Sequence, residues 1–202
     1  MTALDRVLPE YQFHEFHARK IHATPERIYA SIKAVTADEI RFFRALTWIR
    51  RFGRPLPPSI LSAPKGLGLL DLATRTTFVT LADGPDEILV GTVVMRPPGE
   101  PRPRTADEFL ALRQRRGFAL AVMNFAIGRI DNGTSVVSTE TRVYATNASV
   151  RRRFAAYWFV IHGGSALIRR MWLQGIQRRA ESRERPASTT SLERVLSPKA
   201  GD

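Results

Sequence analysis

The sequence predicts an α+β fold in which an antiparallel sheet packs against one long C-terminal helix. Asn132-Gly133 separates two apolar runs, and this is the strongest short signal for a β-hairpin. Apolar residues recur every three or four positions between Val150 and Ile176, as on a helix with one buried face. An expected first strand is followed by two short helical patterns, the second of which ends at residue 52. A chain of 202 residues is expected to form one domain.

The N-terminal part is expected to contain one strand and two short helices. Residues 1–10 are interpreted as a flexible lead-in. Residues 13–22 form a strand whose buried face the pattern does not decide. Thr24-Pro25-Glu26 opens the first helix, because threonine caps helices and proline suits the first helical position. A second helix is expected over residues 37–52, followed by a loop rich in glycine and proline over residues 53–68.

The middle of the chain is expected to consist mainly of strands. Residues 74–82 and 87–95 flank a turn, and residues 96–104, with four prolines, form a loop. A short helical turn is expected over residues 106–112. Residues 118–130 and 134–144 form the hairpin around Asn132-Gly133.

The last helix is expected over residues 149–183. Its central fifteen residues, 154–168, lack a formal charge, whereas a membrane span needs about 20 predominantly apolar residues. The apolar stripe also continues past the arginines on both sides. The segment is therefore interpreted as an amphipathic helix packed on the sheet. Residues 184–202 are charged and rich in serine and proline, so we expect a disordered basic tail.

The composition restricts the chemistry. A net charge of +12 suits either a solvated basic surface or an anionic partner. The absence of cysteine excludes disulfides and thiolate chemistry. The four histidines have no compact metal-ligand spacing, and neither a phosphate-binding loop nor a nucleophile elbow is present. No metal and no cofactor are expected. The N-terminus lacks the apolar core of a signal peptide, so a cytoplasmic location is expected.

Two segments carry a resemblance to a known family. They are ATPERIYASI at Ala23–Ile32 and TETRVYATNASVRRRFAAYW at Thr139–Trp158. With the order of elements, they resemble the START-like superfamily, also called SRPBCC or polyketide cyclase/dehydrase-like, and in particular a bacterial branch of it. The resemblance covers residues 11–183. It implies a helix-grip fold, in which a curved antiparallel sheet wraps the C-terminal helix and leaves a cavity for an apolar ligand. It does not imply one activity.

The hairpin register selects the candidate ligand-binding residues. With a two-residue turn, Phe125 faces Glu140 and Met123 faces Arg142. The smaller, uncharged face is then assigned to the helix side. That face offers polar groups to a ligand in a mostly apolar pocket, or those groups satisfy one another. The candidates on the strands are Asn124, Thr139 and Thr141, and those on the helix are Tyr157, Trp158 and Ile161.

Glu140 and Arg142 are a competing pair of candidates. In the simple register both lie on the solvent side of the sheet. A bulge or a longer turn would move them inward, where a buried ion pair would suggest function.

Three functions follow from these observations. The first is binding of an apolar or amphipathic small molecule without catalysis. The second is a cyclase or aromatase-type enzyme with Glu140, Arg142 or Tyr157 as acid–base group. The third is peripheral binding to an anionic membrane through arginines of the last helix. Nucleic acid is not expected, because no basic surface with stacked aromatic residues is evident. The arginines of the third hypothesis are Arg151, Arg152, Arg153, Arg169 and Arg170.

Overall fold

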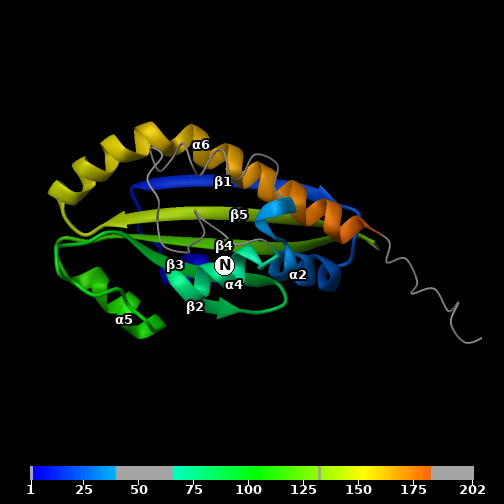
Figure 1. Ribbon diagram of the computed structural model, residues 1–202, viewed down its shortest axis with the longest axis horizontal. Helices are drawn as coiled ribbons and strands as arrows, with labels where there is room; N and C mark the ends of the chain where they lie inside the picture. Colours follow the sequence, from blue (N-terminus) through cyan, green and yellow to red (C-terminus); the bar gives the residue numbers. More distant parts are fainter. Residues whose placement is uncertain (1, 40–65, 132, 183–202) are drawn as a thin grey trace, which may run out of the picture.

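The computed structural model describes residues 2–39, 66–131 and 133–182. Five antiparallel strands form one sheet in the order β1-β5-β4-β3-β2, and a 34-residue helix, α6, runs across one of its faces (Figure 1). The predicted α+β fold with a long C-terminal helix is confirmed. The elements are α1 (Ala3–Val7), β1 (Phe13–Ile21), α2 (Pro25–Ala34), α4 (Leu69–Thr76), β2 (Phe78–Asp83), β3 (Glu87–Met95), α5 (Ala106–Ala111), β4 (Ala119–Asp131), β5 (Thr134–Ala145) and α6 (Ala148–Glu181).

Helix α6 begins and packs as its sequence predicts. The Asn147 side chain accepts a hydrogen bond from the Val150 backbone N–H at 2.9 Å, which satisfies one of the free donors of the first turn. Val150 and Phe154 are buried at one end of the helix, and Trp172 and Ile176 at the other. We call the sheet face that these residues cover the inner face. The apolar stripe therefore does cover the sheet.

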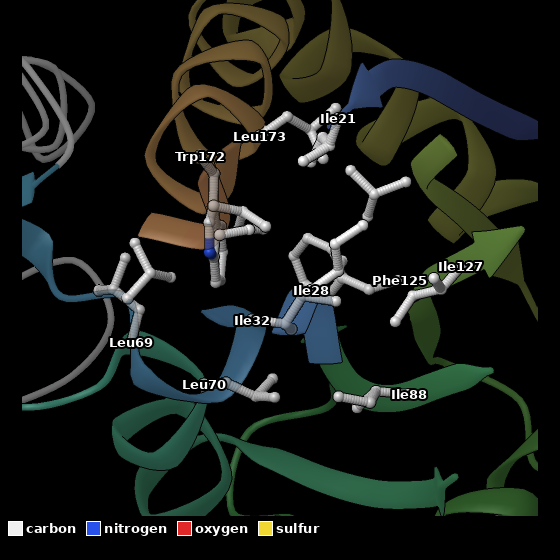
Figure 2. Close-up of a cluster of buried hydrophobic side chains, with 14 of the residues drawn as sticks. Ile21, Ile28, Ile32, Leu69, Leu70, Ile88, Phe125, Ile127, Trp172 and Leu173 are labelled. Atoms are coloured by element: carbon white, nitrogen blue, oxygen red, sulfur yellow. The ribbon is translucent and has the colours of Figure 1, made fainter. Parts of the chain in front are cut away.

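The main hydrophobic core lies under the C-terminal half of α6. Figure 2 shows Trp172 and Leu173 of α6 in one cluster with Ile28 and Ile32 of α2 and Phe125 of β4, and Leu173 lies next to Ile21 of β1. The Trp172 and Phe125 rings meet edge to face with 5.1 Å between their centroids. Helix α4 adds further leucines to this core. The two short helices thus close one end of the space between sheet and α6.

The opposite, outer face of the sheet carries a second core beneath α1 and α5. Leu4 and Leu8 at the N-terminus are fully buried, together with Phe109 of α5. Glu87 accepts a hydrogen bond from the Ala3 backbone N–H at 2.6 Å, and Arg142 donates one to the Leu8 carbonyl at 3.3 Å. The expectation of a flexible lead-in at residues 1–10 is therefore corrected. Apolar side chains and helix-end contacts dock this segment on the sheet.

Two further expectations about elements change. The strand expected from residue 74 begins only at Phe78, because Leu69–Thr76 forms α4 with Leu69, Leu70, Leu72 and Ala73 buried. Of the helix expected over 37–52, residues 37–39 form a short 3-10 turn and the rest lies outside the described residues. Most of the loop expected over 53–68 and the tail over 184–202 lie outside them as well.

The β4–β5 register differs from that of a simple two-residue hairpin. Asp131 pairs with Thr134, but an irregularity between Arg129 and Asp131 shifts the register by one residue. Asn124 consequently faces Glu140, and Phe125 faces Thr139. Because side chains alternate between the faces of a sheet, this single shift reverses the face on which each β4 residue lies.

Candidate functional site

A group of polar side chains lies on the inner face, between the apolar contacts at the two ends of α6. We call this group the inner polar cluster. Strand β1 contributes two members and β5 another two, since Glu15 pairs with Thr141 and His17 with Thr139. Helix α6 supplies the remaining two. The cluster consists of Glu15, His17, Thr139, Thr141, His162 and Arg169.

The Glu15 carboxylate lies at the centre of this cluster. Its side chain is 4% exposed, and its Oε1 is hydrogen-bonded to His17 Nε2 at 2.8 Å. Its buried Oε2 has no hydrogen-bond partner among the described residues. The His162 Nδ1 atom lies 3.8 Å from Oε2, too far for a hydrogen bond. Glu15 thus presents one buried acceptor that the described part of the chain does not satisfy.

Thr139 and Arg169 extend the cluster along the sheet. Thr139 is 1% exposed, and its hydroxyl oxygen lies 3.5 Å from the Arg169 guanidinium. Arg169 is half-buried and turned toward the sheet. The cluster therefore combines a buried carboxylate with hydroxyl and guanidinium donors within one helix–sheet interface.

Aromatic rings flank the inner polar cluster at one end. The Phe13 ring meets Phe154 edge to face at 4.8 Å and lies 6.0 Å from the Trp158 ring. The Trp158 ring lies 5.0 Å from that of His162, which connects this aromatic group to the polar cluster. Buried Trp172, whose Nε1 has no partner among the described residues, belongs to the core at the other end. A few polar groups between apolar walls are typical of small-molecule sites.

The sequence-predicted strand candidates are divided between the two faces. Thr139 and Thr141 lie on the inner face, as expected. Asn124 does not, because the register shift turns it to the outer face. There its amide nitrogen donates to Glu87 Oε1 at 2.8 Å and its carbonyl oxygen accepts from the Glu140 backbone N–H at 2.8 Å. Its expected position beside α6 is therefore corrected.

Glu140 and Arg142 also lie on the outer face, although not in solvent. Arg142 is 8% exposed and donates to Glu140 Oε1 at 2.6 Å and to Asp5 Oδ1 at 2.8 Å. The Thr2 backbone and Arg142 lower the pKa of Asp5 to about 2. The pair therefore holds α1 in place, and it lies across the sheet from α6.

The α6 candidates differ in their orientation. Trp158 is half-buried against Phe13 of β1, and Ile161 is half-buried as well. Tyr157 is 37% exposed, and its ring lies 5.8 Å from that of Phe154. Of the arginines assigned to an anionic surface, Arg169 instead faces Thr139. The others are exposed: Arg151, Arg152, Arg153 and Arg170.

Sequence reasoning did not select Glu15, His17 or His162. The segment FHEFHARKI alternates without one apolar face, since Phe13 and Ile21 share a face with Glu15 and His17. The available signal was a carboxylate and an imidazole two residues apart, which places them on the same side of a strand. Only the pairing with β5 shows that this side is buried.

Two hollows lined by described residues lie outside the inner polar cluster. One of about 710 Å³ lies between α2 and the end of α6 and is lined by Arg27, Arg178 and Arg179 among others. One of about 300 Å³ lies between α4 and the β2–β3 hairpin. Within the described ranges, no three histidine or carboxylate side chains gather closely enough to hold a metal ion, and no helix has the length and apolarity to cross a bilayer.

Comparisons with known proteins found weak structural likenesses only. No family model and no curated protein matches the chain. A solved structure of a protein from Thermus thermophilus is 11% identical, with a TM-score of 0.33 and coverage of 83% of this chain and 97% of that one. The Zhui aromatase/cyclase from a Streptomyces species is 13% identical, with a TM-score of 0.30 and coverage of 84% and 96%.

Norcoclaurine synthase from Thalictrum flavum is a further structural neighbour. It is 7% identical, with a TM-score of 0.28 and coverage of 80% of this chain and 94% of that one. At such low scores these likenesses carry no argument about family or activity. The function has to be argued from the side chains of this chain.

Proposed function

We propose that this protein binds an apolar or amphipathic small molecule between the inner face of the sheet and α6. The bound molecule carries a hydrogen-bond donor, a hydroxyl or an ammonium group, that meets Glu15 Oε2. Its apolar part lies along the neighbouring aromatic side chains Phe13, Phe154 and Trp158. Thr139, Thr141 and Arg169 complete the polar end of the site.

The observation that carries this proposal is the buried Oε2 of Glu15, which has no hydrogen-bond partner among the described residues. Leaving a buried acceptor unsatisfied costs about 1–3 kcal/mol, more for a charged group, so such groups normally have a reason to persist. A ligand that donates a hydrogen bond to this oxygen removes that cost when it binds. The same argument selects the head group, because a carboxylate ligand would place two negative charges together.

The head-group preference provides the test. Dodecylamine, dodecanol and dodecanoate share one alkyl chain and differ in the group presented to Glu15. We expect the amine and the alcohol to bind more tightly than the carboxylate in isothermal titration. Glu15→Gln replaces one of the two carboxylate oxygens by an amide NH2. In this variant the preference is expected to shrink or vanish.

Glu87→Gln is the matched control, because Glu87 is a hydrogen-bonded carboxylate on the outer face. It should keep the wild-type order of affinities. Native mass spectrometry of the purified protein, followed by denaturation, would identify any molecule that co-purifies. Equal binding of the three compounds to wild type and to Glu15→Gln would remove Glu15 as the recognition group.

A cyclase-type enzyme is the second candidate, and the Glu15–His17 hydrogen bond favours it. A carboxylate whose partner is an imidazole at 2.8 Å can act as a general base. Glu140 and Arg142 are unsuited to that role because they lie across the sheet and bind α1. Turnover of a linear polyketide mimic by wild type but not by Glu15→Gln would favour the enzyme, and binding without turnover the carrier.

A further inference from the structure

The side of α6 that faces away from the sheet carries large apolar residues in contact with solvent. Phe159 is 88% exposed, Val160 69% and Leu167 45%. Exposed Ala156 lies one turn before Phe159 and Val160, and exposed Gly163 lies between Val160 and Leu167, so the five form one continuous stripe at helical spacing. A single exposed apolar side chain is ordinary, but a continuous exposed patch marks an interaction surface.

Arginines stand at both ends of this stripe. Arg152 precedes Ala156 by one turn and Arg170 follows Leu167 by one turn, and both are exposed. Arg153 flanks the first end. From Ala148 to Ala180, α6 contains no aspartate or glutamate, while its arginines are Arg151, Arg152, Arg153, Arg169, Arg170, Arg178 and Arg179. The exposed side of the helix is therefore apolar in its centre and cationic at its ends.

We propose that this side of α6 docks the protein on an anionic lipid bilayer. The helix lies parallel to the surface, with Phe159, Val160 and Leu167 in the outer acyl region and Arg152 and Arg170 at the phosphate level. Helices that lie in a membrane interface combine such an apolar strip with arginine or lysine at its edges. From Arg152 to Arg170 the strip is roughly 27 Å long.

The charge and shape of the strip select a bilayer over other occupants. A second copy of the chain would bring two arginine-bearing surfaces together, and the net charge of +12 opposes that contact. A nucleic acid would offer phosphates to the arginines, but Val160 and Leu167 cannot stack on bases, and Phe159 alone is no stacking platform. Anionic lipid supplies phosphates and an apolar layer side by side.

The fold presents this surface without any rearrangement. The opposite side of α6 is held by Val150 and Phe154 at one end and by Trp172 and Ile176 at the other. Figure 1 shows α6 as a continuous helix that runs along the sheet. Docking therefore concerns residues other than the inner polar cluster, and it can succeed or fail independently of ligand binding.

The test measures co-sedimentation of the full chain with vesicles of phosphatidylcholine and of phosphatidylcholine mixed with phosphatidylserine. We expect binding to the mixed vesicles only, with an affinity that falls as salt increases. Phe159→Asp should weaken binding by about tenfold to a hundredfold, the effect of withdrawing one phenyl group from an apolar layer. Arg152→Gln with Arg170→Gln should weaken it by about fivefold for each arginine.

Phe16→Asp is the matched control, because Phe16 is an aromatic residue 52% exposed on β1, away from α6. It should bind as wild type does. Phe159→Trp adds a direct readout: its fluorescence, after subtraction of the wild-type spectrum, should shift to the blue with mixed vesicles. An equal loss of vesicle binding in Phe159→Asp and Phe16→Asp would overturn the docking mode, and so would the absence of a blue shift in Phe159→Trp.

Two further outcomes would also overturn the proposal. One is a dimer in sedimentation experiments without lipid that Phe159→Asp dissolves, since the stripe would then bind a second copy. The other is binding to duplex DNA at low salt that is as tight as binding to mixed vesicles and insensitive to Phe159→Asp. In that case the arginines alone would bind the partner, and the partner would be a polyanion other than a lipid bilayer.

Discussion

Replacing Glu15 by methionine should separate stability from ligand binding. The substitution keeps the length of the side chain but removes the buried carboxylate, including the Oε2 atom that has no hydrogen-bond partner among the described residues. A group kept for binding is expected to lower the stability of the free protein. Methionine at residue 15 should therefore stabilise the chain while abolishing the head-group preference of the ligand site.

The magnitude follows from the contacts of Glu15. Removing an unsatisfied buried acceptor raises the free energy of unfolding by about 1–3 kcal/mol, and losing the hydrogen bond to His17 lowers it by about 1 kcal/mol. The net expectation is a free energy of unfolding higher by about 1 kcal/mol, with the Tm raised by about 2–4 °C. His17 is 13% exposed, so water can replace its lost partner.

Glu87→Met is the informative comparison. Both oxygens of Glu87 are used, by the backbone N–H groups of Ala3 and Leu4 and by the amide of Asn124. Removing this carboxylate should lower the free energy of unfolding by about 2–4 kcal/mol. Urea denaturation followed by circular dichroism measures both variants. A Glu15→Met protein as destabilised as Glu87→Met would refute the reasoning, because Glu15 would then be structural.

The remaining predictions concern packing and pH. Gly91→Ala places a Cβ 2.8 Å from the Phe109 ring, so the Tm should fall by an amount equivalent to about 1–3 kcal/mol. Gly163→Ala on α6 meets nothing within 4 Å and should stabilise by about 0.5–1 kcal/mol; a fall in Tm would contradict an open helical site. Asp5 has a pKa of about 2 against 3.8, so its hydrogen bonds from the Thr2 backbone N–H and from Arg142 stabilise the fold above pH 3.8, and this stabilisation is lost as pH falls through 2. The Tm difference between wild type and Asp5→Asn should therefore shrink as pH falls from 3.8 to 2. A difference that stays constant would exclude a contribution of Asp5 ionisation to stability.

Local patterns accounted for most of the secondary structure. The β4–β5 hairpin, the proline-led helix α2 and the long helix α6 each depend on neighbours in sequence, and the structure contains all three. The α4 segment was missed because residues 69–73 were assigned to no element and residues 74–76 to the strand that follows. Its helix is stabilised by contacts with α2 and the sheet, which no local pattern reports.

The candidate site shows where local patterns stop. One irregularity between Arg129 and Asp131 reversed the faces of β4 and moved Asn124 across the sheet. Strand β1 carries apolar and charged residues on both faces, so its own pattern could not show that Glu15 and His17 are buried. The position of the N-terminal helix depended likewise on partners more than 80 residues away, such as Glu87.

The sequence by itself determined the α+β class, the order of most elements and the buried stripe of α6, because these follow from the spacing of side chains within single segments. Only the tertiary structure decided which strand faces meet α6, and with them the group of Glu15, His17, Thr139 and Arg169. The reason is geometric. Strand side chains alternate with a period of two, so a one-residue change in pairing moves a residue from one side of the sheet to the other, and long-range packing selects that register.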